Sequence, residues 1–182
     1  QGGQSGPLGS AFARCPMTAF QDNQGVATDA LQVQLTALTE ADLEAVVAVE
    51  QLAHPHPWSV GNFKDALKAG NRAEGLKAGT QWVGYYVAMP VLDEVHLLNI
   101  TVAPVFQGQG WARCLMQSLS LWAQTQQATT LWLEVRESNA RALKLYTAFG
   151  FEQVGIRKDY YPVSTNRREA AVVMRMALNS QQ

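Results

Sequence analysis

The sequence predicts a single α/β domain, and three features of the chain support this class. Apolar residues recur at helical spacing soon after residue 30, alternate with a period of two through the middle of the chain, and return to helical spacing after two closely spaced glycines. The chain has 182 residues and 47% hydrophobic content, which suits one domain with a sizeable core. We therefore expect one domain over residues 31–182.

Residues 1–30 differ in character from the rest of the chain. They are rich in Gln, Gly, Ser, Asp and Ala and show no apolar periodicity. The run Gly-Pro-Leu-Gly-Ser at residues 6–10 looks like a cloning scar. We expect residues 1–30 to be a tag scar and a disordered leader, and we leave them out of the fold prediction.

The charge balance and the hydropathy pattern exclude several classes of protein. Fourteen basic and fifteen acidic residues give a net charge of -1, which does not favour direct nucleic-acid binding or an anionic membrane surface. The chain has no run of about 20 apolar residues, and its start lacks the order of a signal peptide. We expect a soluble, cytoplasmic protein that does not bind membranes.

Two helices are expected before the strands. Thr39 can cap the first helix, whose apolar spacing continues to about Leu52 and includes the acidic Glu50. Two prolines then break the chain before Ser59, which can cap a second, short helix that closes near Gly70. A kinked loop is expected to join the two helices.

The rest of the chain alternates between strand and helix patterns. The period of two predicts a meander of strands, and helical spacing then predicts a helix that follows the glycines and ends at about Gln126. Gly150 suits the position after the end of a later helix. The expected strands are 73–78, Gln81–Met89, Val91–Val102, Thr130–Val135, Phe151–Ile156 and Ala170–Leu178, and the later helix is Ala140–Phe149.

The stretch from Asn99 to Ala112 has the properties of an anion site. A strand passes through a proline-marked turn into Gly108 and Gly110, which open a helix. Glycines allow positive φ and close backbone approach, and a helix N-terminus offers unpaired N–H groups and a partial positive charge. This geometry suits a diphosphate, although the same residues could form only a helix-capping loop.

The spacing of these residues separates the stretch from other phosphate-binding loops. It is neither the dinucleotide fingerprint G-x-G-x-x-G nor the P-loop. The pattern Gln-x-x-Gly-x-Ala at Gln107 to Ala112 instead resembles the coenzyme A motif Q/R-x-x-G-x-G/A of the GNAT acetyltransferase superfamily. Trp111 departs from the small or aliphatic residue often seen at its position, and we expect it to pack sideways without blocking backbone contacts.

Glu134 interrupts an apolar strand. Strand alternation places Leu131, Leu133 and Val135 on one face and Glu134 on the other, between Trp132 and Arg136. The purely structural interpretation is an ordinary ion pair of Glu134 with Arg136 or Arg113. The alternative is a carboxylate with a catalytic function.

The segment from Leu131 to Phe151 resembles one particular group within this superfamily. Its pattern L-W-L-E-V-R-x-S-N-x-x-A-x-x-L-Y-x-x-x-G-F is similar to the RimI group of GNAT enzymes, the bacterial ribosomal-protein-alanine N-acetyltransferases. The resemblance covers about residues 33 to 178. Three further segments resemble that group: His54–Ser59 (H-x-x-P-W-S), Leu92–Glu94 through Asn99–Ile100, and Arg157–Pro162 (R-x-x-Y-Y-P).

The resemblance implies a fold and a set of site residues. The fold is a mixed, mostly antiparallel sheet that is splayed between its fourth and fifth strands, with helices on both faces and acetyl-CoA entering at the splay. Glu134 would be the general base and Tyr146 the general acid, and Trp58, Tyr160 and Tyr161 would bind the peptide. The residues that would contact acetyl-CoA are Ile100, Thr101, Val102, Gln107, Gly108, Gln109, Gly110, Trp111, Ala112, Arg113 and Asn139.

The tyrosines also have purely structural interpretations. Tyr146 shares helical spacing with Leu143 and Phe149 and could belong to a buried stripe. Tyr160 and Tyr161 are expected in a loop before the last strand, where they could serve packing alone.

An α-amine is the easier acceptor for this chemistry. Its reference pKa of about 7.7 to 8.0, against about 10.4 for lysine, gives a neutral fraction near pH 7 that is several hundred times larger. In the RimI group the acceptor is the alanine at the start of the eighteenth protein of the small ribosomal subunit. Two alternatives stay open: a GNAT enzyme that acts on lysine or a small-molecule amine, and a non-catalytic acetyl-CoA-binding module.

Neither a metal nor a covalent acetyl-enzyme is expected. His54, His56 and His96 lack carboxylate or thiol neighbours at ligand spacing, and acetyl transfer needs no Lewis acid. The chain has no G-x-S-x-G elbow that would present a nucleophilic serine. Direct transfer in a ternary complex is the expected route.

Overall fold

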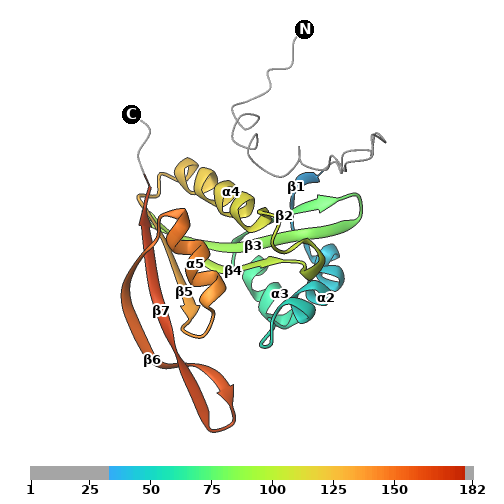
Figure 1. The fold of residues 1–182 in the computed structure, drawn as a ribbon. Helices are drawn as coiled ribbons and strands as arrows, with labels where there is room; N and C mark the ends of the chain where they lie inside the picture. Colours follow the sequence, from blue (N-terminus) through green and yellow to red (C-terminus); the bar gives the residue numbers. More distant parts are fainter. Residues whose placement is uncertain (1–32, 179–182) are drawn as a thin grey trace, which may run out of the picture. The chain divides into compact units, whose positions relative to one another are not determined.

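The computed structural model describes residues 33–178 (Figure 1). The expected scar and leader over residues 1–30 lie outside the described residues, and a single domain over residues 31–182 stays a prediction. The elements are β1 Val33–Ala37, η3 Glu40–Asp42, α2 Leu43–Ala53, α3 Val60–Lys68, β2 Arg72–Ala78, β3 Gln81–Val91, β4 Glu94–Val102, η4 Pro104–Phe106, α4 Trp111–Thr125, β5 Thr130–Arg136, α5 Ala140–Phe149, β6 Glu152–Ser164 and β7 Arg167–Ala177.

The seven strands form one mixed sheet. They hydrogen-bond in the order β1-β2-β3-β4-β5-β7-β6, and β4 pairs with β5 in parallel. The pairs of β5 with β7, of β6 with β7 and of β1 with β2 are antiparallel. The β4–β5 register ends at Leu97 and Leu133, although β4 continues to Val102 and β5 to Arg136. The predicted mixed sheet with a splay between its fourth and fifth strands is confirmed.

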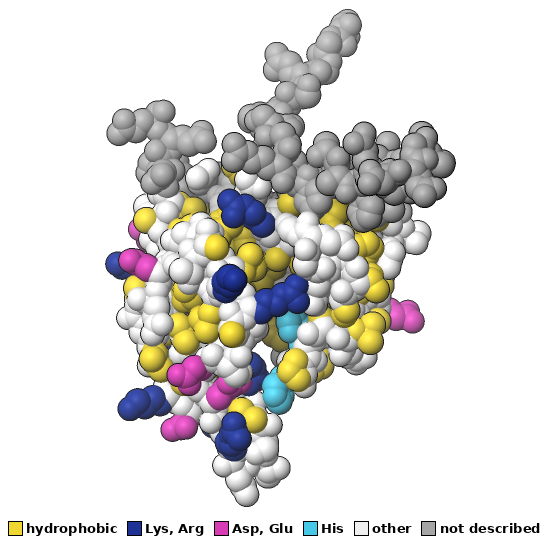
Figure 2. Space-filling model, in the orientation of Figure 1, with side chains coloured by type: hydrophobic (Ala, Val, Ile, Leu, Met, Phe, Trp, Pro, Cys, Tyr) yellow, Lys and Arg dark blue, Asp and Glu magenta, His cyan; other side chains and the backbone are white. Residues whose placement is uncertain are grey.

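The chain folds as two compact units. The first contains described residues 33–86 and Ile100–Ser118, and the second contains Val87–Asn99 and residues 119–178. Among the described residues, no helix is long and apolar enough to cross a membrane. Acidic and basic side chains are interspersed on the face seen in Figure 2, in line with the net charge of -1.

The first unit begins with a strand that the sequence analysis missed. β1 pairs with β2 from Val33↔Ala78 to Ala37↔Glu74. The segment is only 5 residues long, which is too short for a clear period of two, and its partner lies about 40 residues later in the chain. Long-range pairing therefore creates β1.

Of the two predicted caps of the first unit, Ser59 is confirmed, whereas Thr39 caps the short 3-10 turn η3 and the N-cap of α2 itself is Asp42. The Asp42 carboxylate accepts a hydrogen bond of 3.0 Å from the backbone N–H of Thr39, and a 3-10 turn leads into α2. The Ser59 hydroxyl accepts one of 3.2 Å from the backbone N–H of Asn62 at the start of α3. The largest fully buried side chains of this unit are Trp82, Tyr85, Tyr86, Phe63, Leu115 and Met116.

The second unit contains a long β6–β7 hairpin, drawn in orange and red (Figure 1). The predicted strand ended at Ile156, but β6 continues to Ser164, and β7 begins at Arg167 instead of Ala170. The polar residues and the proline after Ile156 hide the strand in the sequence. Pro162 is tolerated because β6 is the edge strand, so the missing N–H can face outward.

Candidate functional site

The glycine loop of the first unit, residues 107–110, has the predicted conformation. β4 ends at Val102, η4 follows, and Gly108 and Gly110 have φ of 77° and 90° before α4 begins at Trp111. These left-handed conformations favour glycine. The loop therefore leads directly into the first turn of α4, whose leading N–H groups have no partner within the helix.

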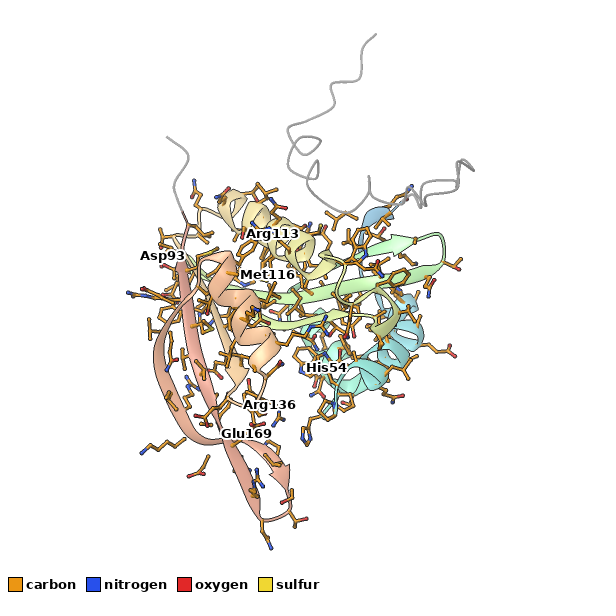
Figure 3. All side chains as sticks on the ribbon, in the orientation of Figure 1. His54, Asp93, Arg113, Met116, Arg136 and Glu169 are labelled. Carbon is orange, nitrogen blue, oxygen red and sulfur yellow. The ribbon has the colours of Figure 1, made fainter. Side chains whose placement is uncertain are left out.

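Side chains brace this loop from within the first unit. Gln107 donates from Nε2 to the carbonyl of Val102 at 3.0 Å, which ties the loop to the end of β4. Trp111 is buried and donates from Nε1 to Gln109 Oε1 at 3.3 Å, in agreement with sideways packing. Arg113 projects from the first turn of α4 (Figure 3). Because the side chains of Gln107 and Trp111 are engaged within the first unit, the groups that the loop offers to a ligand are mainly backbone groups.

Glu134 lies in β5 on the less buried face of the strand. Buried and half-buried residues alternate along β5 as predicted, and 26% of the Glu134 side chain is exposed. Its Oε1 lies 3.1 Å from Nε of Arg157 on β6. The ion pair foreseen with Arg136 is wrong in its partner, because Arg136 instead binds Glu169 at 2.8 Å. Glu134 is a carboxylate with one arginine partner and access to solvent.

The Arg136–Glu169 pair joins β5 to β7, and both residues are labelled in Figure 3. Glu169 also accepts a hydrogen bond of 3.3 Å from the backbone N–H of Ser138. The hydrogen bonds from Ser138 and Arg136 hold the pKa of Glu169 below its usual range. Arg136 additionally donates to the carbonyl of Pro162 at 3.1 Å. Arg136 therefore ties the far end of β6 to β5.

Tyr160 and Tyr161 lie in β6, so the prediction that they occupy a loop is wrong. Arg157 pairs with Ala171 of β7 whereas Tyr161 pairs with Glu169, so four steps on β6 match two steps on β7. Asp159 in this bulge has a φ of 50°. Bulges of this kind redirect side chains and are frequent next to functional sites. They also interrupt the alternation of side chains, so the sequence shows no period of two here.

The bulge brings Tyr161 to Glu134. The Tyr161 hydroxyl donates to the backbone carbonyl of Glu134 at 3.4 Å, and the Arg136 guanidinium lies 4.5 Å from the ring centre. Burial, together with the nearby Glu134 charge, raises the pKa of Tyr161 to about 12. Tyr160 packs edge-on against Tyr161 at 5.0 Å and lies near the Arg157 guanidinium at 5.3 Å. The structure thus gathers three predicted site residues of the second unit, Glu134, Tyr160 and Tyr161, together with two arginines.

Tyr146 is buried on α5, with its ring 5.9 Å from that of Phe151. Burial raises the pKa of Tyr146 above its ordinary value, so the hydroxyl stays protonated at neutral pH. The packed ring agrees with the structural interpretation, and the protonated hydroxyl is what a general acid requires. Asn139, predicted to touch coenzyme A, caps α5 by accepting a hydrogen bond of 3.1 Å from the Ala142 N–H.

Trp58 lies in the segment before α3, half-buried and edge-on to Phe63 at 5.2 Å. Its backbone N–H donates to Glu50 Oε1 at 3.1 Å. Glu50 is 1% exposed and also binds the side chains of Tyr85 and Thr101. The sequence analysis gave Glu50 no function, although an acidic residue on the apolar spacing of a helix was a visible signal.

Two of the three histidines, His54 and His96, have a carboxylate neighbour in the structure, which the sequence spacing was not expected to give. His54 Nε2 lies 3.9 Å from Glu50, and His96 Nε2 lies 3.2 Å from Glu94. His54 directly follows α2 and lies four residues after Glu50, a spacing that brings the two side chains close together. Within residues 33–178, no group of three or more His, Cys, Asp or Glu residues could hold a metal ion.

The comparison with known families identifies the chain. The model of the "Acetyltransferase (GNAT) family" matches residues 43–151, which include the glycine loop, Glu134 and Tyr146. The chain belongs to the GNAT acetyltransferase family. Several curated GNAT proteins resemble it over nearly their whole length.

A relative named "[Ribosomal protein bS18]-alanine N-acetyltransferase" from Haemophilus ducreyi is 39% identical over 146 residues, which are 79% of this chain and 99% of the relative. The protein of the same name from Escherichia coli K12 is 38% identical over 147 residues, covering 80% and 97%. The predicted resemblance to the RimI group is thereby confirmed.

Solved structures agree with the fold. The crystal structure of the ribosomal-protein-S18-alanine N-acetyltransferase from Escherichia coli matches with a TM-score of 0.76 and 35% identity, covering 83% of this chain and 97% of that one. A GNAT acetyltransferase from Elizabethkingia anophelis with acetyl-CoA bound matches with a TM-score of 0.67 and 24% identity, covering 80% and 98%.

Proposed function

We propose that this protein transfers an acetyl group from acetyl-CoA to the N-terminal α-amine of a protein, the alanine of ribosomal protein bS18. The observation that carries the proposal is the identity of 38–39% to the two curated enzymes of that name described above, over at least 97% of the length of each. The partly exposed Glu134 carboxylate supports it as well, because the reaction needs a base. An enzyme with this substrate works in the cytoplasm.

The cofactor site uses backbone groups. The N–H groups of Gly108 to Arg113 bind the diphosphate of acetyl-CoA, favoured by the glycine conformations and by the N-terminus of α4. Backbone groups of Ile100, Thr101 and Val102 bind the pantetheine arm, and Asn139 adds a contact. No metal is required for this chemistry.

The transfer is direct. Glu134 removes a proton from the α-ammonium group, directly or through a water, and the amine nitrogen then attacks the thioester carbonyl carbon. A backbone N–H of β4 stabilises the negative charge on the carbonyl oxygen. The carbon–sulfur bond breaks as the intermediate collapses, and Tyr146 gives its proton to the departing thiolate. The nitrogen, which still carries an excess proton after the attack, releases it to the Tyr146 phenolate or to solvent. The products are the acetylated amine and coenzyme A.

The acceptor peptide is bound by aromatic residues. Tyr160 and Tyr161 stand beside Glu134, since Arg157 links Glu134 to Tyr160 and the Tyr161 hydroxyl reaches the Glu134 backbone. Trp58 binds the peptide from the segment before α3. Direct nucleic-acid contact is not part of the proposed function.

A comparison of acceptors tests the proposal. Release of coenzyme A is measured with a synthetic peptide that begins with alanine, beside the same peptide with a blocked α-amine and an internal lysine. We expect turnover only with the free α-amine. Acetylation of the blocked peptide would move the assignment to lysine, and silence with both despite acetyl-CoA binding would favour a small-molecule amine or a binding module.

A further inference from the structure

Glu50 is a buried carboxylate for which the proposed chemistry has no use. It is 1% exposed, and desolvation makes such a charge costly unless donors surround it. The donors around Glu50 include the Tyr85 hydroxyl at 2.5 Å, the Thr101 hydroxyl at 3.0 Å and the backbone N–H of Trp58 at 3.1 Å. Tyr85 is itself completely buried.

The donors come from segments that the proposed function assigns to different ligands. Thr101 lies in the part of β4 that is proposed to bind pantetheine, and Trp58 lies in the segment that is proposed to bind the peptide. Tyr85 anchors Glu50 to β3 in the core. One carboxylate on α2 therefore holds the acetyl-CoA strand and the acceptor segment of the first unit together.

The hydrogen-bond chain also includes His54. Thr101 gives its one hydroxyl hydrogen to Glu50, so the 2.8 Å contact between Thr101 Oγ1 and His54 Nε2 requires His54 to donate. His54, labelled in Figure 3, directly follows α2 and opens the segment that ends at Trp58. The segment is thus bound to β4 directly through His54 and indirectly through Glu50.

The backbone of β4 at Thr101 has little freedom to move toward β3. A Cβ at Gly84 would lie 2.5 Å from the Thr101 carbonyl oxygen, and the Ala103 N–H donates to the Val83 carbonyl at 2.9 Å. The Glu50 hydrogen bonds hold the same residue by its side chain. The backbone and the side chain of Thr101 are therefore both held by contacts within the first unit.

We propose that Glu50 is a positioning residue that sets the backbone of β4 for acetyl-CoA and the Trp58 segment for the acceptor. The inference rests on the proposed function for the identity of the two ligands. Glu50 acts through Thr101 and Trp58 and touches neither ligand itself.

The chain contains a matched control for this role. Glu74 is also a buried carboxylate of the first unit, and it accepts a hydrogen bond of 2.7 Å from Tyr86, the residue next to Tyr85. Its other partners are Arg72 at 2.6 Å and Ser118 at 3.4 Å, which lie outside the proposed ligand-binding segments. Replacing Glu74 perturbs a similar buried network without touching β4 or Trp58.

The test compares Glu50→Gln with Glu74→Gln in the full chain. The dissociation constant for acetyl-CoA is measured by calorimetry, KM for the alanine peptide by turnover, and Tm for both variants. We expect Glu50→Gln to weaken acetyl-CoA binding and to raise the peptide KM, each about fivefold, as the loss of one or two hydrogen bonds predicts. Glu74→Gln should lower Tm comparably and leave both constants within about twofold.

A second pair keeps the test informative where Glu50→Gln does not fold. Tyr85→Phe removes one donor to Glu50, and Tyr86→Phe removes the equivalent donor to Glu74. Weaker acetyl-CoA binding in the first variant alone supports the proposal. Equal effects in both members of a pair, or unchanged binding in both, overturn it. The acetyl-CoA measurement needs no acceptor, so a wrong acceptor assignment shows in wild-type turnover and leaves this test intact.

Discussion

The glycine loop and the surroundings of Glu134 are built from different parts of the chain. The loop is formed by consecutive residues, and its proposed binding groups are backbone N–H groups at the start of α4. Around Glu134, side chains from β5 and β6 meet through strand pairing and a bulge. The loop therefore depends on local conformation, whereas the region of Glu134 depends on register over long distances.

This difference predicts how each region responds to substitution. In the loop, we expect substitutions to matter most at the glycines with positive φ and at Gln107, which ties the loop to β4. In the proposed mechanism, Glu134 has a chemical role that no neighbouring side chain can take over. Three experiments test this contrast, in order of expected effect.

The replacement Glu134→Gln should have the largest effect. The amide cannot accept a proton from the α-ammonium group, so we expect kcat to fall about ten- to thousandfold with little change in acetyl-CoA binding. Steady-state turnover of the alanine peptide measures it. Glu152→Gln, which removes the exposed ion pair with Arg175, is the control. Wild-type kcat in Glu134→Gln would remove Glu134 from the mechanism.

Tyr146→Phe separates a general acid from a core residue. The ring contact with Phe151 is kept, so Tm should change little, while loss of the proton donor should lower kcat about tenfold. Turnover and thermal unfolding are measured on the same preparation. An unchanged kcat would leave Tyr146 with a packing role alone.

Gly110→Ala should have the smallest effect of the three. We expect it to weaken the binding of acetyl-CoA and to leave the acetyl-transfer step unchanged. A Cβ at a φ of 90° strains the backbone by about 1–2 kcal/mol, which we expect to raise the KM for acetyl-CoA roughly fivefold or more at unchanged kcat. Gln109→Ala is the matched control, because it removes only contacts within the loop, to Trp111 and Val105. Equal KM changes in the two variants would show that side chains, and not the backbone, shape this loop.

The same contrast explains which features the sequence could predict. The glycine loop, α4, and the caps at Ser59 and Gly150 follow from neighbouring residues, and the structure has them where the pattern placed them. The alternation that exposes Glu134 in β5 is equally local. Features set by neighbouring residues could therefore be predicted from the sequence. The motifs in these segments also carried the resemblance to the family.

The missed features all depend on distant partners. β1 forms only by pairing with β2, and β6 is extended only by pairing with β7. The partners of Glu50, Tyr85 and Thr101, lie 35 and 51 residues later in the chain, so the sequence spacing marks Glu50 as buried but does not reveal these contacts. Arg157 belongs to the R-x-x-Y-Y-P segment, but the sequence does not show that it contacts Glu134. That contact exists only because the sheet places β6 near β5.

Because of the bulge in β6, the number of residues between Arg157 and Tyr161 determines how Tyr161 is placed relative to Glu134. Arg157 contacts the Glu134 carboxylate, and Tyr161 contacts its backbone carbonyl. Because side chains alternate between the faces of a strand, the loss or gain of one residue in this stretch would send Tyr161 to the opposite face and leave Arg157 in place. Relatives with a different strand length here would thus present a different acceptor surface around the same carboxylate, without any substitution at it.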